Sequence, residues 1–163
     1  MGAKLHIANL VSSLLPQTRC FALRRRIYRH AGIALAGSSR INGGVVFQNA
    51  NVSIGQDSWV GRRTEFVSTS NAHISIGSNC DISQDVLFVV GSHEIGESDR
   101  RAGKGKSRPI SVGDGTWVGA RATFLGGSSV GKGVVVGAGS TVIGDYPDNV
   151  LLVGTPARII RYL

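Results

Sequence analysis

Hydrophobic residues recur at every sixth position in the C-terminal part of the chain. In VGDGTWVGARATFLGGSSVGKGVVVGAGSTVIG, residues 112–144, they hold one unbroken register, which we call the frame: Val112, Val118, Phe124, Val130, Val136 and Val142. The same spacing joins two earlier triplets: Ile54, Val60 and Phe66, then Ile76, Ile82 and Phe88. A small residue usually follows each frame residue, and another stands four positions after it.

A period of six predicts short strands joined by tight turns. Strand side chains alternate between two faces, so a frame residue and the residue four positions later both point inward. A helix would repeat every 3.6 residues instead. Three units bring the chain round to its starting side, and successive coils then stack. We therefore expect an all-β solenoid, a parallel β-helix with a triangular core. A β-sandwich, with strands every 8 to 12 residues, and a glycine-rich linker both fit this register poorly.

Two interruptions break the frame. The step from Phe66 to Ile76 is ten residues, so the chain is expected to bulge around residues 68–73. Between Phe88 and Val112 the frame is lost across the polar, charged segment VGSHEIGESDRRAGKGKSRPI. This pattern predicts a loop over residues 91–110 that leaves the coil, and loops on rigid scaffolds are where function concentrates.

Helical spacing precedes the repeat, over residues 1–32. Apolar residues follow a helical pattern from Ile7 to Leu15, and Pro16 ends it. Residues 18–30 mix apolar side chains with five arginines in a second helical stretch. This segment is expected either to cap the open end of the β-helix or to lie on an anionic membrane as a basic amphipathic pair.

Composition and charge narrow the function. The 163 residues allow one domain with a short appendage, and 42% hydrophobic content with 17% charge argues against disorder. The net charge is +8, residues 1–56 contain no acid, and a second basic cluster lies between Arg100 and Arg108. No nucleic-acid motif accompanies these cations. The only cysteines, Cys20 and Cys80, predict no disulfide framework and fit a reducing cytoplasm.

Three segments beyond the repeat carry a family resemblance: GSHEIG (91–96), PISVGDGTWVGARATFLGG (109–127) and VLLVGTPARIIRYL (150–163). With the frame, they resemble the hexapeptide-repeat acyltransferases, and among these the galactoside, maltose and colanic-acid O-acetyltransferases. The resemblance implies a left-handed β-helix over 33–148, an exception to the usual crossover hand, and a tail, 149–163, near coenzyme A. It also implies acetyl-CoA as co-substrate, no metal, and a homotrimer whose active sites lie between two subunits.

The catalytic residues implied by this resemblance are His93 and Ala120. His93 stands where the family carries its general base, which takes a proton from the acceptor hydroxyl as it attacks the thioester. The backbone N–H of Ala120, which follows Trp117-Val118-Gly119, would stabilise the resulting oxyanion. Without the resemblance, His93 would be interpreted as an ordinary surface histidine and Ala120 as a small residue in a turn.

Coenzyme A would lie along residues that match the family's binding segments: Trp117, Gly119, Lys132, Ala138, Gly139, Thr155, Pro156 and Arg158. Trp117 precedes a frame residue and should therefore face outward. Arg158 and Lys132 would meet phosphates, although Lys132 is equally interpreted as a solvated turn residue. Gly144 departs from the pattern, because galactoside and maltose relatives have a lysine there.

The sequence defines the acceptor of the acetyl group less well than the donor. Glu65 stands where sugar-specific relatives appear to carry an asparagine, and Asp99 and Arg100 in the loop would contact a sugar or orient His93. The sequence is interpreted as a cytoplasmic acetyl-CoA-dependent O-acetyltransferase acting on a sugar or glycoconjugate, in surface polysaccharide or glycolipid synthesis. Peripheral contact with the inner membrane face is the alternative to capping for residues 1–32; capping is the favoured interpretation, and the two are compatible.

Several alternatives stay open. They are N-acetylation of an amino sugar, acetylation of serine, and a structural β-helix without activity. A zinc carbonic anhydrase is disfavoured because His73 and His93 form no close metal-binding pair. Transfer should be direct, since neither Cys20 nor Cys80 has a suitable base nearby in the motif.

Overall fold

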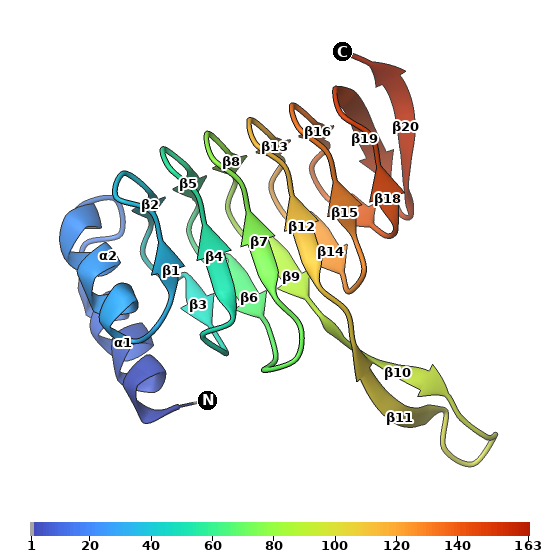
Figure 1. The fold of residues 1–163 in the computed structure, drawn as a ribbon, viewed down its shortest axis with the longest axis horizontal. Coiled ribbons are helices and arrows are strands. Elements are labelled where there is room, and N and C mark those ends of the chain that lie inside the picture. The colour runs from blue at the N-terminus through green and yellow to red at the C-terminus, as the bar shows by residue number, and fades with distance from the viewer. Residues whose placement is uncertain (1) are drawn as a thin grey trace.

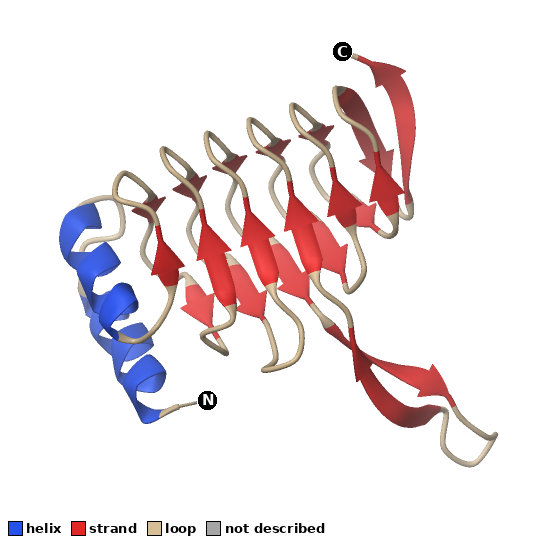
Figure 2. Ribbon diagram, in the orientation of Figure 1, coloured by secondary structure: helices blue, strands red, loops and turns tan. Residues whose placement is uncertain are grey.

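Three sheets of parallel strands form the faces of a triangular prism in the computed structural model, which describes residues 2–163 (Figures 1 and 2). Sheet 1 contains β1 (Ala34–Leu35), β4 (Val52–Ile54), β7 (Ile74–Ile76), β12 (Ile110–Val112), β15 (Ser129–Val130) and β18 (Asp145–Tyr146). Sheet 2 contains β2 (Arg40–Ile41), β5 (Trp59–Val60), β8 (Asp81–Ile82), β13 (Trp117–Val118), β16 (Val135–Val136), β19 (Val150–Gly154) and the antiparallel β20 (Ala157–Tyr162). Sheet 3 contains β3 (Val46–Phe47), β6 (Glu65–Val67), β9 (Leu87–Val89), β14 (Thr123–Leu125) and β17 (Thr141–Val142).

The chain visits the sheets in the order 1, 2, 3 in every complete coil. In Figure 1 the strands of sheet 1 face the viewer and point upward, and the chain returns downward behind them while it advances to the right. This path is a left-handed coil. Turns join sheets 1 and 2 along one edge of the prism, sheets 2 and 3 along a second, and sheets 3 and 1 along the third. We call these the 1–2, 2–3 and 3–1 edges.

The frame residues fill the core as the spacing predicted. Ile54 pairs in register with Ile76, Ile76 with Val112, and Val112 with Val130, and all of them are buried. The frame also extends one coil further toward the N-terminus than the sequence analysis followed it, through Leu35, Ile41 and Phe47, which are six residues apart and buried.

Four stacked phenylalanines run through this core on the inner face of sheet 3. The ring centroids of Phe47, Phe66, Phe88 and Phe124 are 4.9, 5.0 and 4.8 Å apart in succession. This separation is close to the spacing of neighbouring strands, so each ring lies over its equivalent in the next coil. Each such pair contributes about 0.5–1.5 kcal/mol beyond area burial.

Two helices cover the N-terminal end of the prism: α1 (Ala3–Leu14) and α2 (Phe21–His30) (Figure 2). The first coil would otherwise expose unpaired carbonyls. Side chains from the helices cap five of these carbonyls: Arg29 at Leu35, Arg25 at Ser39, Arg24 at Ile41, Tyr28 at Val45, and Asn9 at Phe47. The arginines that suggested a membrane surface are thus partly used as caps within the chain.

Arg24 is fully buried in this cap and donates to four carbonyls and the Ser12 hydroxyl. Burial lowers the pKa of its guanidinium. Contact of the N-terminal segment with a membrane stays a prediction. Within residues 2–163, no helix is both long and apolar enough to cross one.

The two interruptions lie on the 3–1 edge and differ in form. The short one folds back on itself through a bridge between Thr69 and Ala72. The long one, expected as a loop over 91–110, is instead an antiparallel hairpin of β10 (Gly91–Ile95) and β11 (Ala102–Ser107), which projects from the prism (Figure 1). Its strands lack an alternating apolar pattern because neither face is buried, so the residue pattern there contains no strand signal.

Candidate functional site

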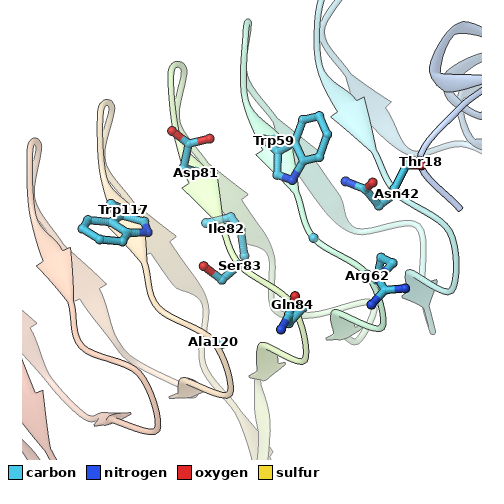
Figure 3. A pocket seen from close by; sticks show the side chains of 11 residues that line it. Thr18, Asn42, Trp59, Arg62, Asp81, Ile82, Ser83, Gln84, Trp117 and Ala120 are labelled. Carbon is cyan, nitrogen blue, oxygen red and sulfur yellow. The ribbon is translucent and has the colours of Figure 1, made fainter.

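A groove of about 590 Å³ follows the outer side of sheet 2 and the 2–3 edge (Figure 3). Its walls come from four successive coils and from the segment between the helices: Thr18, Asn42, Trp59, Gly61, Arg62, Asp81, Ile82, Ser83, Gln84, Trp117 and Ala120. The groove therefore contains two of the residues that the resemblance singled out, Trp117 and Ala120.

Trp117 faces outward, as expected for the residue before frame residue Val118. Its side chain is 56% exposed, and its backbone pairs with Asp81 in β8 and Val135 in β16. Figure 3 shows Trp117, Asp81 and Trp59 in a row along sheet 2. An indole held by strand pairing on an open face offers a flat apolar surface to a ligand.

Ala120 stands at the turn that follows β13, and its backbone is only half paired. Its carbonyl accepts a hydrogen bond of 2.9 Å from the Gly139 N–H, whereas its own N–H has no partner among residues 2–163. The turn is closed by Ala122 N–H to Gly119 O at 3.4 Å, and Arg121 has a φ of 60°. These features define a type II turn, in which the N–H of the second residue points away from the turn.

The expected coenzyme A residues after Ala120 continue along the same edge. Ala138 and Gly139 form the equivalent turn one coil later. The Thr155 hydroxyl donates to Gly139 O at 3.3 Å, so the Gly154–Pro156 turn joins this row. Gly139 leaves open space around its Cα. The structure thus brings Ala120, Ala138, Gly139, Thr155 and Pro156 onto one strip of surface.

Gly119 has a packing role in this strip. A Cβ there would lie 2.5 Å from Ala138 N and 2.8 Å from Val136 O, both in the next coil. Any side chain would therefore push the coils apart. A glycine is explained at this position without a ligand.

Lys132 and Arg158 differ in position. Arg158 lies in β20 and is exposed next to the Gly154–Pro156 turn, with one guanidinium N–H bonded to Ala157 O at 3.0 Å. Lys132 lies on the 1–2 edge instead, because it follows a frame residue of sheet 1, and its Nζ is 3.8 Å from Asp114 Oδ2. The structure does not bring Lys132 to the strip that holds Ala120.

His93 also lies away from the groove within one chain. It is exposed in β10, opposite Gly105 of β11, on the hairpin that leaves the 3–1 edge. Asp99 and Arg100 are exposed at the turn of the same hairpin, where the Arg100 N–H bonds to Glu97 O. His93 and Ala120 therefore occupy different edges of the prism, and a single chain does not bring them together.

Glu65 lies on the outer face of sheet 3, between Val46 and Leu87 in register. It lines a separate depression beside the ion pair between Arg63 Nε and Asp85 Oδ1, 2.7 Å apart. The hydrogen bonds from Arg63 lower the pKa of the Asp85 carboxyl. Glu65 is not part of the groove.

Sequence reasoning missed the part of the groove before Ala120. Trp59 and Asp81 precede frame residues Val60 and Ile82 just as Trp117 precedes Val118. That shared position was the available signal, because all three must face outward on sheet 2. Further along, Asn42 is buried with an Oδ1 that has no hydrogen-bond partner among the described residues, while its Nδ2 donates to Val60 O.

Neither cysteine is among the residues that line this groove. Cys80 is buried in the core, with its Sγ 3.2 Å from Gly113 O, and burial raises the pKa of its thiol. It therefore stays protonated at neutral pH. Over residues 2–163, no group of three or more histidine, cysteine, aspartate and glutamate side chains is arranged to hold a metal ion.

Known proteins share this architecture. Residues 109–144 match the family described as bacterial transferase hexapeptide (six repeats). The galactoside O-acetyltransferase of Escherichia coli (strain K12) is 32% identical over 127 residues, covering 67% of this chain and 63% of that protein. This chain belongs to the hexapeptide-repeat family. It spans less than two thirds of the length of that curated relative.

Two solved structures resemble this one over nearly the whole chain. A hexapeptide-repeat acetyltransferase from Vibrio cholerae, complexed with acetyl coenzyme A, is 25% identical with a TM-score of 0.80, over 99% of this chain and 86% of that one. A galactoside acetyltransferase in complex with coenzyme A is 25% identical with a TM-score of 0.78, over 99% and 84%. This chain therefore shares its β-helix and its two N-terminal helices with proteins that were solved with acetyl coenzyme A or coenzyme A bound.

Proposed function

We propose that the protein transfers an acetyl group from acetyl-CoA to a hydroxyl of a sugar or glycoconjugate. The observation that carries this proposal is the backbone N–H of Ala120, which has no partner among residues 2–163 and belongs to a residue that lines the groove. Such an N–H can serve as the oxyanion donor that the reaction requires. Relatives solved with acetyl coenzyme A and coenzyme A support the same donor here. Coenzyme A would lie along the strip from Pro156 to Ala120, with Trp117 beside its pantetheine arm.

The proposal requires a second copy of the chain. His93 is on the hairpin of the 3–1 edge, and Ala120 is on the 2–3 edge. A closed ring of three copies would let the hairpin of one chain reach the groove of the next, and closed cyclic symmetry is the usual form of homo-oligomers. We therefore assign each active site to two neighbouring subunits of a homotrimer.

The reaction then follows from the groups present. The acceptor oxygen attacks the thioester carbonyl carbon, and its proton passes to the imidazole of His93 from the neighbouring chain. The tetrahedral oxyanion accepts a hydrogen bond from Ala120 N–H. The intermediate collapses, the carbon–sulfur bond breaks, and the thiolate of coenzyme A takes the proton from the imidazolium. The general base contributes about 10²–10⁴-fold to the rate.

The acceptor would occupy the groove beyond Ala120. Asp81, Ser83 and Gln84 line it with polar groups, and Trp59 adds an aromatic face. At its far end stands Asn42, whose buried Oδ1 has no hydrogen-bond partner among residues 2–163. This combination favours a polyhydroxylated acceptor such as a sugar of a surface polysaccharide or glycolipid.

The test is release of free coenzyme A from acetyl-CoA with a panel of sugars, nucleotide sugars, lipid-linked saccharides, amino sugars and serine, for wild type and His93→Ala. Acceptor-stimulated release that falls by at least about 100-fold in His93→Ala supports the proposal. Stimulation by amino sugars or serine alone would replace O-acetylation of a sugar by those alternatives. Binding of acetyl-CoA without release for any acceptor, or equal rates in both proteins, would overturn the role of His93.

A further inference from the structure

A serine, a histidine and an asparagine stand in line on the outer face of sheet 1, away from the groove. Ser53 Oγ is 2.7 Å from His73 Nε2, and His73 Nδ1 is 2.7 Å from Asn51 Oδ1. Ser53 lies in β4, and His73 ends the short interruption just before β7. All three side chains are half-buried. Neither the acetyl-transfer mechanism nor the frame accounts for this arrangement.

The surrounding hydrogen bonds fix the direction of proton transfer. Asn51 Nδ2 donates to the carbonyls of Thr69, at 3.1 Å, and Ser70, at 3.5 Å, so its Oδ1 must face His73. An amide oxygen can only accept, so His73 carries its proton on Nδ1. In the neutral imidazole Nε2 is then an acceptor, and the Ser53 hydroxyl donates to it. The order is nucleophile, base and orienting group.

We propose that Ser53 is a nucleophile activated by His73, which forms a covalent ester with activated acyl donors such as aryl esters and thioesters. Ser53 Oγ attacks the carbonyl carbon, and His73 Nε2 takes the hydroxyl proton. The bond from the carbonyl to the leaving group breaks, and the leaving phenolate or thiolate takes that proton from the imidazolium. Asn51 acts as a positioning residue, because it holds the imidazole in the required tautomer.

Two features of the surface set the expected rate. A depression of about 260 Å³ beside His73 is lined also by Ser75, Ser111, Ser129 and Asp145, but Ser53 is not among its lining residues, so the nucleophile stands outside it. The nearby N–H groups of Ile74 and Ile110 already donate to the carbonyls of Asn51 and His73. Because these two N–H groups are not free to stabilise an oxyanion, acylation should be slow and limited to one turnover.

The same face supplies a matched control. Ser75 pairs directly with Ser53 in the next coil, points to the same side, and lines the depression. It has no hydrogen bond to His73 among the described residues. Reactivity that depends on the His73 contact should therefore distinguish two serines of equal chemistry in equivalent positions.

The experiment treats the full-length protein with p-nitrophenyl acetate, and separately with a fluorophosphonate probe, and locates the adduct by peptide mass spectrometry. It uses the His93→Ala background, so that acetyl transfer at the groove cannot contribute. We expect one adduct per chain on Ser53, no adduct at that position in Ser53→Ala, and unchanged labelling in Ser75→Ala. His73→Gln should slow labelling by about 100-fold or more.

Asn51→Ala should slow labelling as well. Asn51→Asp should restore part of the rate, because a carboxylate also accepts from Nδ1–H although it loses the Nδ2 hydrogen bonds to Thr69 and Ser70. A purely structural role for Asn51 would not distinguish these two variants. Circular dichroism and urea unfolding identify any variant that fails to fold. Equal labelling of Ser53 and Ser75, or a His73→Gln rate equal to wild type in a folded protein, would overturn the proposal. Either result leaves the proposed acetyl transfer untouched.

Discussion

The two interruptions of the frame leave the same edge of the prism and place their histidines in opposite situations. The short interruption returns to the coil after one bridge, and His73 is held there by two hydrogen bonds to its own chain. The long one extends as a paired hairpin, and His93 stands exposed on it (Figure 1). The lengths of the two interruptions explain this difference. A segment of only a few residues must return to the neighbouring strands before it can extend away from the edge.

This contrast indicates where each histidine finds its reaction partner. His73 needs nothing beyond its own chain, since the base, the hydroxyl and the orienting amide come from adjacent coils. His93 is on a different edge from Ala120, and under the proposed function it would need the groove of another copy. The two proposals thus differ, because one arrangement is complete in the monomer and the other would be completed only by assembly.

The largest expected effect is on acetyl transfer, and it is tested with trimers that combine two different variant chains. Ala120→Pro removes the N–H while fitting the second position of a type II turn. Alone, Ala120→Pro and His93→Ala should each lose acetyl transfer by about 10²-fold or more. Co-refolded together, they should recover a substantial fraction of wild-type activity, because some sites combine an intact His93 with an intact Ala120. Coenzyme A release measures this directly.

Ala120→Gly, which keeps the N–H, serves as the control and should retain activity. Homogeneous trimers of a doubly substituted chain should show no recovery after the same refolding. If co-refolded single variants stayed inactive although mass photometry showed mixed trimers, both groups would have to come from one chain. That result would break the contrast between the two histidines.

The two interruptions should also differ in how much they contribute to the stability of the protein, and this effect is expected to be smaller than the loss of activity. Asn51→Ala removes hydrogen bonds that tie the short interruption to the coil, and each net contribution is about 0.5–1.5 kcal/mol. Replacing residues 94–104 by Asn-Gly keeps His93 opposite Gly105 through a two-residue turn. Because the replaced side chains are mostly exposed, we expect that variant to unfold at nearly the wild-type urea concentration. An equal loss in both variants would mean that the hairpin contributes to the stability of the assembly.

The smallest effect is expected at the 2–3 edge, which carries no interruption of the frame. The Arg63–Asp85 ion pair joins two coils there at the surface, and it lowers the pKa of Asp85. A lowered carboxyl pKa contributes stability above the pKa of the unfolded chain, and this contribution is lost as pH falls through the folded value. Asp85→Asn should therefore lower the melting temperature slightly at pH 7. The difference from wild type should vanish at acidic pH; a difference that persisted there would require a cause other than charge.

The sequence by itself determined the coil and its inward face. A strict period of six leaves few alternatives, because each frame position must meet its equivalent in the next coil, and Phe66, Phe88 and Phe124 do so. The same reasoning set Trp117 outward, and it would have set Trp59 and Asp81 outward had it been applied to every coil. Local motifs also marked the interruptions, because polar residues such as Glu97 and Asp99 cannot enter a narrow core.

Only the tertiary structure decided which residues share an edge. Lys132 and Ala120 look equivalent in the sequence, yet the turns that hold them lie on different edges, since their frame residues belong to different sheets. The link between Ser53 and His73 was equally hidden, because twenty residues separate positions that stacking places 2.7 Å apart. Periodicity fixes which side of a strand a residue faces. Proximity across coils depends on how many residues each interruption removes from the repeat, and that is settled by folding.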